Sequence, residues 1–160
     1  PQGSGGTGYF GGSGAKVGLK DRIALDLALA PIDDPQIDVI ISTMGGNDNQ
    51  ASLDNGTFAS AVSTTIAACK YRWPNAVILF SEPLTSDTGQ LTADKSTIIQ
   101  AQATAAGVKF VGGIRAALAA YYAVPGNSVS DLFHGDGHPN DAGHAWFADQ
   151  LNTRIRAALA

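Results

Sequence analysis

The chain alternates between short apolar runs and longer amphipathic segments. The apolar runs are rich in β-branched residues and predict buried strands over residues 37–44, 76–80 and 108–111. Segments with apolar residues at three- and four-residue steps predict helices over residues 17–30, 50–70, 92–106, 114–122 and 141–159. Because strands and helices alternate, the pattern predicts an α/β fold with a parallel sheet covered on both faces.

Proline, glycine and capping residues set the expected ends of these elements. Pro31 and Pro74 stop the first two helices, and Gly107 ends the third. Asn140 is the expected N-cap of the last helix, since its side-chain oxygen can accept a hydrogen bond from the first turn. In parallel sheets, chemistry gathers at the loops that follow the strands. The loop after residue 44 and the segment before residue 141 are therefore the places to search.

Composition narrows the class of protein. The chain has 160 residues, enough for one domain over 1–160, with 44% hydrophobic and 15% charged residues. Its ten Lys and Arg are scattered and its net charge is −4, so we expect neither a nucleic-acid nor a membrane partner. The single cysteine, Cys69, excludes an internal disulfide and a thiolate metal cage.

The start of the chain is rich in glycine. Eight of the 19 glycines fall in residues 1–18, a composition that suits a flexible linker. Tyr9 and Phe10 in the middle of this run favour instead a loop that packs, and both interpretations remain open. Pro1 is neither an initiator Met nor the start of a signal peptide, so we expect that a segment upstream has been removed.

Two segments carry candidate chemistry. After the first predicted strand, Gly45 and Gly46 allow a sharp turn, and Asn47 offers an amide donor that suits an oxyanion hole or an ordinary turn. All three histidines, His134, His138 and His144, lie within eleven residues. With Asp136 and Asp141 they suit either a metal site or a general base oriented by a carboxylate. His144 also suits a packed or half-exposed position on the last helix.

Three motifs in this order resemble the SGNH (GDSL-type) hydrolases. They are Gly-Gly-Thr-Gly-Tyr at 5–9, Gly-Gly-Asn-Asp at 45–48, and Asp-Gly-His-Pro-Asn-Asp-Ala-Gly-His at 136–144. The resemblance covers almost the whole chain. It implies a flavodoxin-like three-layer sandwich with five parallel strands, an esterase activity, and no metal or organic cofactor.

The resemblance also assigns roles to residues. Gly6, with Gly5 as the alternative, and Asn47 correspond to the oxyanion-hole donors, and His138 corresponds to the catalytic base. The family usually places its triad acid three residues before the histidine, where this chain has Gly135. The resemblance therefore leaves open whether Asp136 orients the His138 ring or a backbone carbonyl does so.

The family's first block, Gly-Asp-Ser, supplies the nucleophile and does not occur in these residues. In the family that block precedes the glycine block. We therefore expect an upstream polypeptide segment, either a separate chain or a lost part, to carry the serine and the first strands. Without it, one edge of the predicted strand 37–44 would lack a partner.

These inferences predict a serine esterase whose serine lies outside the chain. Acetylated carbohydrate is the expected substrate class and an extracellular location goes with it, while lipid and simple carboxyl esters remain open. The alternative is a non-catalytic domain that kept the fold, such as a glycan-binding module or a virion component. The absence of Gly-Asp-Ser from the chain favours that alternative.

Overall fold

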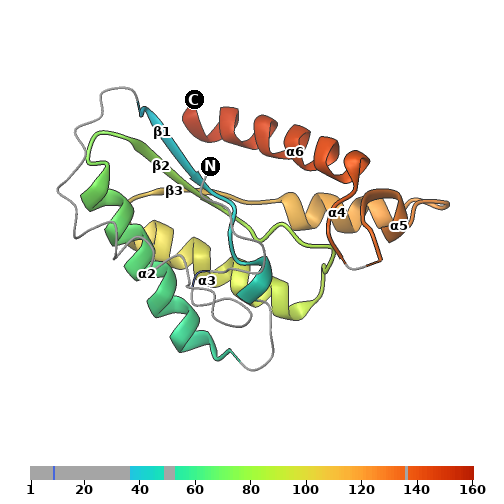
Figure 1. Cartoon of the computed structure of the whole chain (residues 1–160), viewed down its shortest axis with the longest axis horizontal. Helices are drawn as coiled ribbons and strands as arrows, with labels where there is room; N and C mark the ends of the chain where they lie inside the picture. The colour runs from blue at the N-terminus through green and yellow to red at the C-terminus, as the bar shows by residue number, and fades with distance from the viewer. Residues whose placement is uncertain (1–8, 10–36, 49–52, 136) are drawn as a thin grey trace.

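A computed structural model of the chain describes residues 9, 37–48, 53–135 and 137–160, although the side chain of Asn47 lies outside the description. Figure 1 shows strands and helices in alternation. The strands are β1 (Val39–Ser42), β2 (Val77–Ser81) and β3 (Lys109–Val111). The helices are the short 3-10 helix η1 (Gly46–Asp48), then α2 (Asn55–Arg72), α3 (Gln90–Ala106), α4 (Ile114–Tyr122), α5 (Val129–Leu132) and α6 (Asp141–Leu159).

The described sheet has three parallel strands in the order β1-β2-β3. Ile41 of β1 lies opposite Leu79 of β2, which in turn lies opposite Lys109 of β3. The predicted α/β class with a parallel sheet is therefore confirmed. The assignment of residues 1–160 to one domain stays a prediction.

Helices pack on both faces of this sheet (Figure 1). On one face, α2 and α3 pack over a core that includes Phe58, Ile66, Phe80 and Ile99. On the other face, Leu79 and Val111 pack with residues of α4, α5 and α6, among them Phe147. Alternate residues of β2 thus enter two different cores, as the period of a strand requires.

Caps explain where the helices begin and end. The Asp54 side chain accepts a 2.8 Å hydrogen bond from the Thr57 amide at the start of α2, so this helix begins later than the predicted residue 50. Gly107 adopts a left-handed φ of 67° and ends α3 as predicted. The predicted Asn140 N-cap and the bounds of α4 and α6 are confirmed. The helix predicted over 17–30 lies outside the described residues.

One expectation about the elements was wrong, and one helix was not expected. The strand predicted to be buried over 37–44 is confined to Val39–Ser42, and Val39 and Ile41 are 40% and 44% exposed. These side chains lie on the face of the sheet that α6 covers. Helix α6 packs over β3, however, and β3 is at the opposite edge of the described sheet from β1. Helix α5 was missed because four residues carry no periodic signal; a capping box between Ser128 and Asp131 stabilises it.

Gly143 in the first turn of α6 allows a close approach between the helix and the preceding segment. A Cβ atom at this position would overlap the backbone carbonyl oxygen of Leu132 and lie 3.2 Å from Pro139 Cβ. The Leu132 carbonyl also accepts the Asn140 amide, at 3.0 Å. A side chain at residue 143 would therefore push α6 away from the turn that carries His138.

We expect Gly143→Ala to lower the free energy of unfolding by about 2 kcal/mol, the usual range for overpacking, although Ala is the better helix former. Urea titration followed by circular dichroism measures the change. Gly135→Ala is the control, because a Cβ there would meet nothing within 4 Å. Equal stability of the two variants would contradict the close approach.

Candidate active site

The loops that follow β1 and β2 contact each other at the carboxyl edge of the sheet. Gly45 has a φ of +113°, and a Cβ on it would lie 3.2 Å from Pro83 Cγ. A Cβ on Gly46 would lie 3.3 Å from the Leu84 carbonyl oxygen. The two glycines thus serve the close packing of two loops, in addition to the sharp turn that the sequence predicted.

Asn47 lies in the middle of η1, directly after the carboxyl end of β1. The short helix begins where the Asp48 amide donates a 3.2 Å hydrogen bond to the Gly45 carbonyl. This position at the end of a parallel strand is the one the sequence predicted. The oxyanion role of the Asn47 side chain stays a prediction.

Asp48 connects the loop after β1 to the start of the chain. Its Oδ2 atom accepts a 2.6 Å hydrogen bond from the backbone amide of Tyr9. The Tyr9 hydroxyl is hydrogen-bonded to Ser42 Oγ at 2.8 Å, and its ring stacks on Phe80 and meets Phe58 edge-on, each at 5.9 Å between centroids. Complete burial raises the pKa of the Tyr9 hydroxyl far above its usual value, with a small opposing effect from Ser42.

Tyr9 therefore packs in the core. At this residue the structure agrees with a loop that packs, and not with a flexible linker. The oxyanion candidate Gly6, and its alternative Gly5, lie outside the described residues. Gly6 precedes Tyr9 by only three positions. The observed anchoring of Tyr9 places the end of the glycine block beside β1, and the role of Gly6 stays a prediction.

His138 lies on a tight turn between α5 and α6. The His134 amide donates to the His138 carbonyl at 2.8 Å, and the Gly137 amide donates to the His134 carbonyl at 2.9 Å. Phe133 and Pro139 form an antiparallel bridge at the base of this turn, and Gly137 adopts a φ of +82° within it. The turn thus fixes the backbone of an exposed histidine with local hydrogen bonds.

This turn adjoins the loop that follows β2. A Cβ atom on Gly137 would lie 3.7 Å from Ser86 Oγ. The loop after β2 thus packs closely against the Gly45 loop at Pro83 and Leu84, and its Ser86 lies beside the histidine turn. The segments that carry Asn47 and His138 are brought to the same edge of the sheet, as predicted.

The remaining candidates are less close or lie outside the description. Asp136 is outside the described residues, so its role as the triad acid stays a prediction. His144 is exposed on α6, which agrees with a half-exposed helix histidine. Within the described ranges, no group of three or more His, Cys, Asp or Glu side chains is arranged to hold a metal ion.

Two buried charged residues were missed by the sequence analysis. Glu82, directly after β2, accepts hydrogen bonds from Ser96 Oγ at 3.2 Å and from the Arg115 amide at 2.7 Å, at the start of α4. Lys95 of α3 is fully buried, and burial lowers its pKa. The only signal for Lys95 is its spacing from the buried residues Thr92 and Ile99, which lie on the same face of α3.

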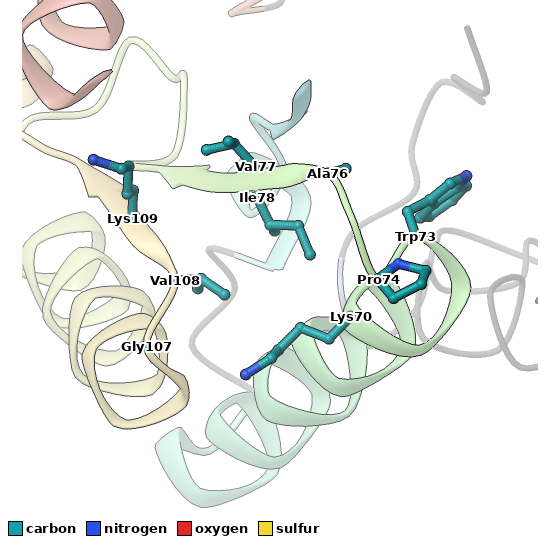
Figure 2. A pocket seen from close by; sticks show the side chains of 9 residues that line it. All are labelled: Lys70, Trp73, Pro74, Ala76, Val77, Ile78, Gly107, Val108 and Lys109. Atoms are coloured by element: carbon teal, nitrogen blue, oxygen red, sulfur yellow. The ribbon is translucent and has the colours of Figure 1, made fainter. Parts of the chain in front are cut away.

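A different hollow opens at the amino edge of the sheet, between the ends of α2 and α3 (Figure 2). Its volume is about 270 Å³, and Trp73, Ile78 and Gly107 are among its lining residues. Lys70 also lines it, and its Nζ donates a 2.7 Å hydrogen bond to the Ala106 carbonyl at the end of α3. Because the strands are parallel, this hollow lies at the opposite end from Asn47 and His138.

Cys69 can be set aside as a nucleophile. Its side chain is 4% exposed in the core beneath α2. Burial raises the pKa of the Cys69 thiol to about 11, so at neutral pH it remains an uncharged core residue.

Comparisons with known proteins bear on this arrangement. A search of curated proteins and a search of solved structures each returned no match. In the described parts of the chain, no helix combines the length and apolarity that crossing a membrane requires. Residues 3–146 match the GDSL-like Lipase/Acylhydrolase family, over a span that contains all three motifs and ends within α6. With a parallel α/β fold and a match over most of its length, the chain belongs to the GDSL-like lipase and acylhydrolase family of hydrolases.

Proposed function

We propose that the chain is the larger part of a serine esterase, with acetylated carbohydrate as its substrate class and an extracellular place of action. The observation that carries this proposal is the meeting of three loops at the carboxyl edge. The Gly45 loop packs against the loop after β2, and the turn that carries His138 lies beside it. Membership of an acylhydrolase family supports acyl transfer as the chemistry proposed for this edge.

In the proposed mechanism, a serine hydroxyl attacks the ester carbonyl while His138 takes its proton. The Gly6 amide and Asn47 donate hydrogen bonds to the oxyanion that forms. His138 then returns the proton to the departing alcohol, and water releases the acyl group by the same steps in the second half of the reaction. Asp136 orients the His138 ring, and no metal or organic cofactor takes part.

The serine comes, in this proposal, from an upstream polypeptide segment that carries Gly-Asp-Ser. Within the described sheet, β1 pairs with β2 on one side, and Val39 and Ile41 remain 40% and 44% exposed. A parallel strand beside β1 would extend the sheet, and its own side chains would flank Val39 and Ile41 on the same face. The same strand would deliver its following loop, with the serine, to the edge where His138 lies.

The competing proposal is a non-catalytic glycan-binding or structural domain with the same fold. The observation in its favour is that Gly-Asp-Ser does not occur in residues 1–160. The two proposals differ in whether a reactive serine accompanies the chain.

Labelling with a fluorophosphonate probe separates them. We expect protein isolated from its natural source to hydrolyse p-nitrophenyl acetate and to carry the probe on a Gly-Asp-Ser peptide, detected by mass spectrometry. The 160-residue chain alone should show neither property, since it supplies the base and oxyanion donors without the nucleophile. Protein that contains a Gly-Asp-Ser segment but neither reacts nor hydrolyses esters would favour the non-catalytic domain.

His138→Ala should lower kcat of the protein with its upstream segment by about 10²- to 10⁴-fold, the usual contribution of a general base. His144→Ala is the matched control, because this second exposed histidine lies on α6 and outside the turn. Steady-state kinetics at matched folded concentrations measure both variants. Equal losses, or recovery on adding zinc, would favour a metal site instead.

Asn47→Ala should lower kcat by about 10²- to 10³-fold with a small change in KM, because an oxyanion donor acts mainly in the transition state. A thermal melt of the same variant reports on its role in the turn. If the melting temperature falls while kcat is unchanged, Asn47 belongs to the turn alone.

A further inference from the structure

We infer that Asp48 is the positioning residue of the oxyanion hole, because its carboxylate ties the glycine block at the start of the chain to the loop that carries Asn47. The inference rests on the proposed function, since it concerns the geometry of the proposed donors. It adds a residue to which neither the family match nor the motif resemblance gives a role.

The tie is a short hydrogen bond between segments far apart in the chain. The Tyr9 amide donates to Asp48 Oδ2 at 2.6 Å, across 39 residues of sequence, and Asp48 is 3% exposed. A charged acceptor makes such a bond shorter and stronger than one between neutral groups. In the sequence, Asn47 directly precedes Asp48, and Gly6 precedes Tyr9 by three residues.

Tyr9 is a rigid point of attachment. Its ring lies between Phe58 and Phe80, and its hydroxyl is hydrogen-bonded to Ser42 at the carboxyl end of β1. The ring contacts fix where Tyr9 sits in the core, whereas the bond to Asp48 fixes its backbone. Asp48 therefore holds the backbone of Tyr9, the last residue of the glycine block, against the loop that carries Asn47.

Lys95 of α3 is a buried charge that is attracted to Asp48. Lys95 Nζ donates to the Leu53 carbonyl at 2.9 Å and to Asn55 Oδ1 at 3.2 Å, and lies 4.7 Å from the centre of the Phe58 ring. Burial lowers the pKa of Lys95, and attraction to Asp48 is the largest effect that opposes this shift, ahead of Asp54 and Asp94. Asp48 and Lys95 are thus two buried residues of opposite charge, and their attraction partly offsets the effect of burial on Lys95.

Replacing buried opposite charges by an apolar pair of similar volume often leaves the stability of a core unchanged or raises it. A carboxylate at residue 48 does something that an apolar side chain cannot do, because it accepts the Tyr9 amide in one orientation. Oxyanion donors act only when they lie at hydrogen-bond distance from the developing charge, and a displacement of about 1 Å can lower the rate about 10²-fold. Positioning, rather than stability, is therefore the role that the geometry assigns to Asp48.

The test uses the protein with its upstream segment and compares Asp48→Ala with Asp54→Ala. Asp54 is the matched control, since it also attracts Lys95 but bonds to Thr57 of α2 and not to Tyr9. We expect Asp48→Ala to lower kcat about 10- to 100-fold with KM changed less than about threefold, and Asp54→Ala to keep kcat. In Asp48→Ala the Tyr9 amide should also exchange its hydrogen faster, as measured by NMR.

Asp48→Ala removes a charge that attracts the buried Lys95 and takes away the acceptor of the Tyr9 amide, so the fold itself could be lost. Asp48→Leu combined with Lys95→Met removes both charges and keeps an apolar pair in the core. If Asp48 positions the donors, this double variant melts near the parent temperature but keeps a low kcat and a fast Tyr9 amide. Parental kcat in the folded double variant, or in folded Asp48→Ala, would overturn the inference.

Kinetics of the four variants distinguish a wrong positioning role for Asp48 from a wrong esterase mechanism. If His138→Ala and Asn47→Ala lower kcat while the folded Asp48 variants keep it, only the positioning role is wrong. If His138→Ala and Asn47→Ala also keep kcat, the esterase mechanism itself is wrong.

Discussion

Parallel pairing of β1, β2 and β3 makes all three strands point the same way, so the loops that follow them emerge at one edge of the sheet. Helices must then return the chain to the other edge, and they cover the two faces as they do so. Because all three strands end at the same edge, the segments that follow them lie together there. They are the Gly45 loop, the Pro83 loop and the start of α4 at Ile114. The chemistry proposed for the protein depends on this single constraint.

The loop after β2 is the common neighbour of the two halves of the proposed site. Pro83 and Leu84 pack against the glycines that precede Asn47, and Ser86 lies beside the turn that carries His138. Glu82, buried at the start of this loop, accepts hydrogen bonds from α3 and α4 and so fixes the loop to both faces of the sheet. A carboxylate with these partners orders the loop without requiring contact with substrate.

Local patterns predicted most of the described fold. β-Branched runs located the strands, and caps such as Asn140 and Gly107 located helix ends, because both depend on residues near in sequence. The exposure of Ile41 could not be predicted, because it depends on where α6 packs along the sheet. Motif order located Asn47 and His138, whereas the burial of Lys95 depends on Leu53 and Asn55, 42 and 40 residues away. A hydropathy pattern treats such a lysine as exposed.

The two faces of the sheet support different halves of the site. Tyr9, which leads into the glycine block, belongs to the core under α2 and α3, whereas Phe133, at the base of the histidine turn, packs with Phe147 of α6 in the other core. Proteins open in cooperative units that follow such packing boundaries. If the layer of α5 and α6 opens first, the proposed base His138 leaves the proposed site while the core that holds Tyr9 stays in place. The hydrolase would then lose its activity by partial unfolding at temperatures where most of its helical structure is still intact.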